Sequence, residues 1–134
     1  HPKIIRDTKV SVIIPTIGTK DTKTGIIMVS RAIATLRAAE THIDFETIVV
    51  TTGELDPIPG ADQQIVYTTT NFNFAEAINL GRTAANGEYL LILNDDTTVA
   101  DPEPITRLLE VGQNSGVGIT GAKLTYPDGR LQHV

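Results

Sequence analysis

The sequence predicts an α/β fold with a mainly parallel sheet between two layers of helices. Short, β-branched apolar runs alternate with segments whose apolar residues recur at helical spacing, a pattern typical of parallel sheets with helical crossovers. Polar residues end three of the runs, at Thr16, at Thr51 and at 94–96. Ligands bind beyond the carboxyl ends of the strands in such sheets, so we expect one nucleotide-sized cleft along this edge.

Composition and charge are those of an ordinary folded domain. The 134 residues are 40% hydrophobic and 20% charged, and we expect a single domain over 1–134. A formal net charge of -5 with scattered Lys and Arg argues against nucleic-acid binding. The apolar runs are too short to cross a bilayer, so we expect no transmembrane segment and a cytoplasmic location. The absence of cysteine excludes disulfides and zinc–thiolate sites.

The first half of the chain predicts three strands and one helix. Residues 9–16, KVSVIIPT, predict a strand buried on both faces. Apolar residues at helical spacing predict a helix over about 25–40. A second strand is expected to begin at Phe45 and end near Thr51, followed by a Pro- and Gly-rich loop over 52–62. QIVYTT then predicts a short third strand.

The second half predicts two helices, a fourth strand and a hairpin. A helix is expected over 73–85, where Phe74 belongs to one apolar or small-residue face. EYLLILN predicts a buried fourth strand that ends at Asn94. ADPEPITRLLEVGQ predicts a helix with Asp101 as its cap and proline in the first turn. The PDG turn at 127–129 predicts a hairpin near the end of the sequence.

The stretch Asn94-Asp95-Asp96 carries the strongest chemical signal. If the strand continued through it, alternation would point Asn94 and Asp96 one way and Asp95 the other. Carboxylates beside a diphosphate are the usual ligands of a hard divalent cation such as Mg. The competing interpretation is that Asp95 and Asp96 cap a turn, with help from Thr97, because Asp is a common turn residue.

Longer motifs add a family resemblance that covers nearly the whole chain. The order N-x-x-F-A-x-A-x-N-x-G at 71–81, then ANGEYLLILNDDT at 85–97, resembles the inverting family 2 glycosyltransferases of the GT-A fold. VSVIIPT at 10–16 looks like that family's first strand. GVGITGAKLTYPDGRLQHV at 116–134 is similar to its rhamnosyltransferase-like branch. The resemblance implies a Rossmann-like GT-A three-layer sandwich with a C-terminal β-hairpin, which binds a nucleotide-diphosphate sugar.

The resemblance also implies a metal site. Asp96 matches the last acid of the family's Asp-x-Asp motif, which binds Mg or Mn together with the sugar-nucleotide diphosphate. Asn94 stands at the first acid's position, where asparagine is common in this branch although it is a poorer metal ligand. Asp95 is the middle residue and is expected near the ribose or the sugar.

Further nucleotide contacts are implied at matching positions. Pro15 and Thr16 match the segment that lines the base and the ribose. Asn71 and Asn79 match positions that flank the nucleotide pocket, although a helix-to-loop hydrogen bond explains Asn79 equally well.

The end of the second strand departs from the family pattern. The family carries V-V-D-x-G-S there, and this chain has V-V-T-T-G-E. Thr51 stands where the family has an acid that accepts a hydrogen bond from the base, and Gly53 matches the pattern's glycine. Threonine hydrogen-bonds more weakly than a carboxylate, so the choice of base is left open.

The general base is the second departure. An inverting transfer needs a base for the acceptor hydroxyl, and in the family that acid lies well beyond the hairpin, in the half that shapes the acceptor site. We therefore expect a donor-binding portion of a longer enzyme, with no catalytic residue of its own and no transfer activity alone. His133 matches a histidine often found after this hairpin and is a candidate for a site role, although a lone histidine in a hairpin is more often a surface residue.

Other classes of protein remain as alternatives. A non-catalytic nucleotide-binding or scaffold module with the same fold is favoured by Thr51 in place of an acid. A receiver-type or phosphoryl-transfer domain is disfavoured, because its key acid would follow the first strand, where IPTIG has none. A dinucleotide-binding dehydrogenase is disfavoured because no G-x-G-x-x-G follows a strand.

Overall fold

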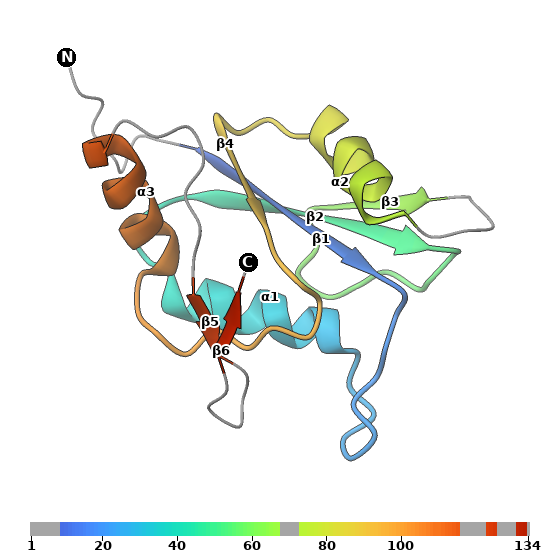
Figure 1. The fold of residues 1–134 in the computed structure, drawn as a ribbon. Coiled ribbons are helices and arrows are strands. Elements are labelled where there is room, and N and C mark those ends of the chain that lie inside the picture. The colour runs from blue at the N-terminus through green and yellow to red at the C-terminus, as the bar shows by residue number, and fades with distance from the viewer. Residues whose placement is uncertain (1–8, 68–72, 116–122, 126–130, 134) are drawn as a thin grey trace.

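The computed structural model describes residues 9–67, 73–115, 123–125 and 131–133, and Figure 1 shows their arrangement. The first seven elements follow the predicted order of strands and helices, in which a loop and not a helix joins the second strand to the third. In chain order the elements are β1 (Val10–Thr16), α1 (Met28–Ala39), β2 (Phe45–Thr52), β3 (Gln63–Tyr67), α2 (Phe74–Thr83), β4 (Tyr89–Ile92), α3 (Pro104–Ser115), β5 (Lys123–Thr125) and β6 (Leu131–His133).

Four parallel strands form the main sheet, in the order β3-β2-β1-β4. β1 pairs with β2 along seven residues, so that Thr16 lies beside Thr51, and with β4 along four residues. The chain proceeds outward from β1 to β2 and β3, and then returns to add β4 on the other side of β1. This reversal makes the space beyond the ends of β1 and β4 a topological switch point, where ligands of such sheets usually bind.

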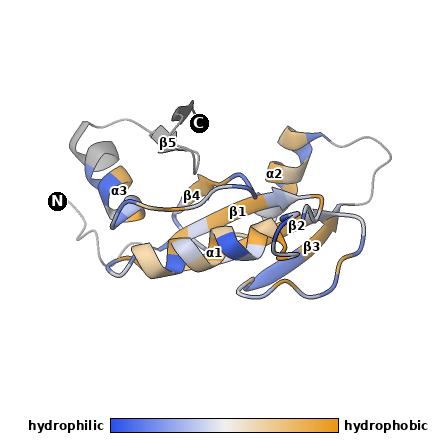
Figure 2. Ribbon diagram, turned by 90° about the horizontal axis from the view of Figure 1, so that it is seen from below, coloured by the Kyte–Doolittle hydropathy of each residue, from blue (hydrophilic) through white to orange (hydrophobic). Residues whose placement is uncertain are grey.

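Helices cover both faces of the sheet, which confirms the predicted three-layer sandwich (Figures 1 and 2). Val12 and Ile14 of β1 pack in a cluster with buried residues of α1 and α3, whereas Ile13 packs in a second cluster with α2. All three side chains are fully buried. β1 is therefore the centre of the core, as its continuous apolar run predicts.

β4 is less buried than the sequence predicts. The strand ends at Ile92 rather than Asn94, and Tyr89 and Leu90 are each 41% exposed. The prediction of a buried strand was wrong because β4 lies at the edge of the described sheet, where β1 covers one side of it. Leu93, which follows the strand, is buried in the cluster with α1 and α3.

Two helices begin later than predicted. α1 was expected from about residue 25, but an isolated bridge between Lys20 and Ile27 holds the preceding loop, and the helix begins at Met28. α3 begins at Pro104, so Asp101 lies too far upstream to be its cap. Proline at the first helical position is nevertheless the arrangement that its fixed φ angle favours.

The final described elements confirm the predicted hairpin. β5 and β6 pair antiparallel, whereas the predicted turn at 127–129 and the glycine-rich segment 116–122 lie outside the described residues. Within the described ranges, no helix combines the length and the apolar character needed to cross a bilayer.

Candidate functional site

A pocket of about 300 Å³ opens at the switch point between the ends of β1 and β4. This volume is at the lower end of the range for small-molecule sites. The lining comes from the end of β1 and its following loop, the first residue of α2, and the turn after β4. The lining residues are Pro15, Thr16, Ile17, Thr19, Phe74, Asn94, Asp95 and Asp96.

One hydrogen bond joins the two sides of the switch point. The Thr16 hydroxyl donates to Asp95 Oδ2 at 2.7 Å and accepts from the Gly18 N–H at 3.0 Å. Thr16 is itself buried, with 3% of its surface exposed. The hydroxyl therefore fixes the Asp95 carboxylate against the end of β1 and fixes the direction in which the chain leaves that strand.

The acidic residues lie in a turn rather than in a continued strand. The Thr97 N–H donates to the Asn94 carbonyl at 3.2 Å, and Asn94, Asp95 and Asp96 all line the same pocket. The expectation that strand alternation points Asp95 away from its neighbours was wrong, because β4 ends at Ile92. Asp95 and Asp96 thus lie in a turn that also lines the pocket, and the metal interpretation of this stretch stays a prediction.

The Asp95 carboxylate of the pocket lies in an environment that disfavours its charge. Burial raises the pKa of the Asp95 carboxyl above its ordinary value, and the charge of Asp96 raises this pKa further, against the lowering effect of the Thr16 hydroxyl. Two adjacent carboxylates repel each other when both are ionised. Together with the Asn94 amide they form an oxygen-rich donor set, which suits a hard divalent cation such as Mg or Mn.

The structure brings five of the predicted site residues together in this pocket and places others elsewhere. The five are Pro15, Thr16, Asn94, Asp95 and Asp96. Asn79 is exposed on α2. Asn71 lies outside the described residues, and His133 lies in β6.

Thr51 lies at the same sheet edge but not in the pocket lining. Its side chain is fully buried, and its hydroxyl donates to the Gly53 carbonyl at 2.7 Å. Gly53 has a φ angle of 81°, a conformation that glycine adopts without strain. The pair therefore shapes the turn after β2.

Sequence reasoning missed three lining residues, namely Ile17, Thr19 and Phe74. Helical spacing placed Phe74 on the core face of α2, yet its side chain is 46% exposed. A positional signal was available, because Phe74 opens the helix that follows β3, and such helices begin at the carboxyl edge of a parallel sheet. Spacing alone does not show that the first turn of a helix extends past the core.

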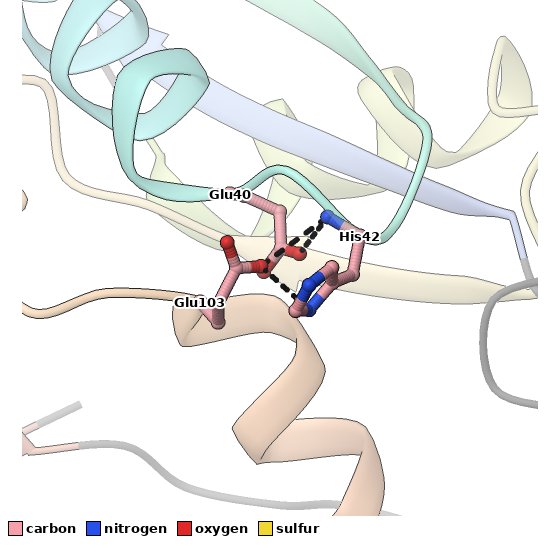
Figure 3. Close-up of side chains that lie close together, drawn as sticks. All are labelled: Glu40, His42 and Glu103. Atoms are coloured by element: carbon pink, nitrogen blue, oxygen red, sulfur yellow. Dashed lines mark hydrogen bonds and ion pairs between the residues drawn. The ribbon is translucent and has the colours of Figure 1, made fainter.

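A second group of potential metal ligands lies at the junction between the end of α1 and the start of α3 (Figure 3). Glu40, His42 and Glu103 each offer a ligand atom, and these atoms lie within 4.8 Å of one another. Their types and spacing are compatible with a bound metal ion. However, Glu40 already accepts the Thr106 N–H at 2.9 Å and the Thr106 hydroxyl at 2.7 Å, so it links the two helices without an ion.

Glu103 is held in the same junction. Hydrogen bonding from the Thr41 hydroxyl is the main cause that lowers the pKa of Glu103 to about 2. Its carboxylate also lies 3.1 Å from His42 Nδ1. The described contacts thus give this group a structural role that explains its geometry.

The fold and the pocket together define a class: a parallel α/β domain with an acidic switch-point site, the place where such domains bind nucleotides. The profile of the family described as "Glycosyl transferase family 2" matches residues 11–132. The chain belongs to glycosyl transferase family 2, which confirms the resemblance found in its motifs.

Two curated relatives support this membership. The protein y4gI of Sinorhizobium fredii is 30% identical over 134 aligned positions, which cover 92% of this chain and 14% of that protein. The O-antigen biosynthesis protein RfbC of Myxococcus xanthus is 31% identical over 133 positions, which cover 93% of this chain and 10% of that protein. The chain therefore spans a small part of the length of both relatives.

A solved structure supports the fold. The 4-diphosphocytidyl-2C-methyl-D-erythritol synthase of Anaerococcus prevotii aligns with a TM-score of 0.59 at 14% identity, over 97% of this chain and 64% of that one. At this level of identity the likeness concerns the fold alone. It agrees with the Rossmann-like α/β architecture described above.

Proposed function

We propose that this chain is the donor-binding portion of an inverting, metal-dependent glycosyltransferase, and that its pocket holds a nucleotide-diphosphate sugar. Family membership supports the reaction class. The observation that carries the proposal is the pocket itself, where Thr16 of β1 and three oxygen-bearing residues after β4 meet at the switch point. The O-antigen biosynthesis name of one relative supports a carbohydrate acceptor for the whole protein.

Asp96 and Asn94 are the residues that we propose as ligands of Mg or Mn. Asp96 is the more exposed acid of the turn, so its carboxylate is free to approach an ion that also contacts solvent and diphosphate. When bound, the ion would supply positive charge for the diphosphate leaving group. Asp95, held by Thr16, faces the ribose or the sugar with a fixed orientation.

Pro15 and Thr16 form the floor of the proposed nucleotide site at the end of β1. Thr51 and Gly53 contribute through the turn that their hydrogen bond fixes. Asn71 and Asn79 stay predictions from the family resemblance, and the cytoplasmic location stays a prediction from the lengths of the apolar runs.

Transfer requires a further group. In the described part of the chain, the pocket holds two carboxylates, Asp95 and Asp96, and both are assigned to the metal and the donor. We propose that the acceptor's base lies outside 1–134, so that these residues alone bind donor without transferring sugar. The second candidate function, a non-catalytic nucleotide-binding or scaffold module, is favoured by the engagement of the Thr51 hydroxyl with Gly53.

Titration calorimetry with UDP, GDP and dTDP, with and without Mg or Mn, tests the donor proposal. We expect nucleotide binding that depends on the metal, because the ion screens the diphosphate from Asp95 and Asp96. Asp96→Asn should lose the metal-dependent part of the affinity and keep its fold, since the substitution removes a charge at nearly constant volume. Equal affinity with and without metal would contradict the proposal.

Asp101→Asn is the matched control for that substitution. Asp101 is an exposed carboxylate outside the pocket, so the same change in net charge should leave nucleotide affinity unaltered. If both variants lost affinity equally, the effect would come from net charge and not from a metal ligand. If thermal unfolding showed Asp96→Asn to be strongly destabilised, Asp96 would be a structural turn residue.

A further inference from the structure

The pocket has an apolar wall that the proposed metal chemistry does not use. Phe74 and Ile17 both line it, and their side chains are 46% and 63% exposed. Exposed apolar surface of this kind loses the hydrophobic stabilisation that burial would provide. Two such side chains that line the same pocket as an acidic turn are more informative than scattered surface apolar residues.

The placement of Phe74 follows from how α2 packs. Residues 74, 77 and 81 share one helix face, and Ala77 of this face is fully buried against the sheet. Phe74 is the first residue of the helix, after the Asn73 cap whose side chain accepts the Glu76 N–H at 3.0 Å. The same face that packs Ala77 on the sheet therefore carries the Phe74 ring to the pocket at the sheet's carboxyl edge.

We propose that Phe74, supported by Ile17, is the stacking platform for the nucleobase of the donor. The inference rests on the proposed function and assigns the part of the ligand that the acidic turn does not bind. A base has two flat apolar faces that stack on an aromatic ring. A sugar presents hydroxyl groups around its rim, which favour polar side chains, so the base is the better match for this wall.

The arrangement of the elements agrees with this assignment. The acidic turn follows β4, at one edge of the described sheet, whereas α2 packs on β1, β2 and β3. The diphosphate and the nucleobase of a nucleotide would thus have separate sites, on the two sides of the end of β1. Thr16, between them, is in contact with the acidic side through Asp95.

A comparison of two ligands distinguishes the contribution of base stacking on Phe74 from that of the proposed metal site. Titrations in Mg would use inorganic pyrophosphate, which has no base, and whichever of UDP, GDP and dTDP binds the unaltered chain most tightly. Phe74→Ala should weaken the nucleoside diphosphate roughly 5- to 150-fold, the range expected for loss of one base–aromatic stack. Pyrophosphate affinity should stay the same, and Phe74→Trp should restore the nucleotide.

Tyr89→Ala is the matched control, because Tyr89 is an aromatic residue of similar exposure, 41%, that does not line the pocket. It should change neither affinity. If Phe74→Ala weakened the affinity for both ligands equally, the stacking proposal would be overturned, because the substitution would have disturbed the whole pocket. A loss confined to the sugar of a nucleotide sugar, with the nucleoside diphosphate unaffected, would also overturn it.

The unaltered chain distinguishes this inference from the proposal on which it rests. Tight metal-dependent binding of pyrophosphate with no gain from the nucleoside would overturn the platform and leave the diphosphate site intact. Failure to bind either ligand in the presence of metal would overturn the proposed function, and the platform with it.

Discussion

Opposing influences act on the pKa of Asp95 in the folded chain. Its carboxylate accepts a hydrogen bond from Thr16 at 2.7 Å, yet burial and the neighbouring Asp96 raise its pKa. A group whose pKa is higher in the folded state favours folding most below its unfolded pKa, and this contribution is lost as the pH rises through the folded pKa. At neutral pH the ionised Asp95 therefore destabilises the ligand-free fold.

Asp95→Asn should accordingly raise the free energy of unfolding at pH 7. Asparagine keeps an oxygen that can accept the Thr16 hydroxyl, and it removes the charge that burial and Asp96 disfavour. The gain should shrink as the pH falls through the folded pKa toward about 4, the ordinary pKa of an aspartate, and should be lost below that pH, because the wild-type carboxyl is then protonated in both states. Urea unfolding at pH 7 and at pH 3.5 measures the difference, and a variant less stable than the wild type at pH 7 would contradict it.

At the level of single residues, the sequence predicted most of the polar lining of the pocket but missed its apolar residues Ile17 and Phe74. Thr16 and Asn94–Asp96 were identified because polar residues at strand ends carry a positional meaning. Phe74 was misplaced because helical spacing describes a face of a helix but not how far the sheet beneath it extends. Thr51 was placed at the right edge, but its burial depends on the turn at Gly53, which a strand pattern does not specify.

The turn between α2 and β4 is held against the sheet by polar contacts and close packing. The Ser11 hydroxyl of β1 accepts the Gly87 N–H at 2.8 Å and donates to Glu46 of β2 at 2.6 Å. Glu46 also accepts the Asn86 N–H at 2.6 Å. Two strands and the turn are thus joined at the amino end of the sheet, where β4 begins.

Gly87→Ala should destabilise the fold by about 1–3 kcal/mol, the usual cost of overpacking. An added Cβ would lie 2.6 Å from the Ser11 backbone nitrogen and 2.8 Å from the Val10 carbonyl carbon, and backbone atoms of the central strand cannot rotate away. Chemical denaturation measures the loss, and a variant as stable as the wild type would show that the turn can move.

Gly81→Ala, in the preceding helix α2, provides a comparison with Gly87→Ala. Its added Cβ would meet Ile13 Cγ2 at 2.7 Å, which is a side-chain atom, and alanine in a helix regains about 1 kcal/mol relative to glycine. We therefore expect a smaller net loss than for Gly87→Ala. The sequence predicted a helix that ends near residue 85, but the close approach of Gly87 to β1 depends on which strands pair.

For the whole molecule, alternation of strands and helices was enough to predict the three layers and the parallel sheet. It was also enough to place Thr16, Thr51 and Asp96 at one edge of the sheet. The strand order β3-β2-β1-β4 was not predicted, because a local apolar pattern shows that a strand is buried but not which strands flank it. The exposure of β4 follows from that order and was missed for the same reason.

Hydrogen exchange should distinguish the central strand β1 from the edge strand β4. β1 is fully buried and has partners on both sides, whereas β4 pairs along four residues and is partly exposed. Amides in the most buried, doubly paired structure exchange through the largest openings. Peptides that cover β1 should exchange more slowly than those that cover β4, and equal rates would show that β4 is protected by more than its described contacts.

The pairing of Val10 with Tyr89 also bears on how the protein is made. A ribosome adds about 5–20 residues per second, so the stretch between the end of β1 at Thr16 and the start of β4 takes roughly 4–14 seconds to appear. β2 can cover one edge of β1 during that time, while the edge meant for β4 stays open. An open edge on an apolar strand invites pairing with other chains. Conditions that slow translation before residue 92 should therefore increase aggregation of the nascent protein.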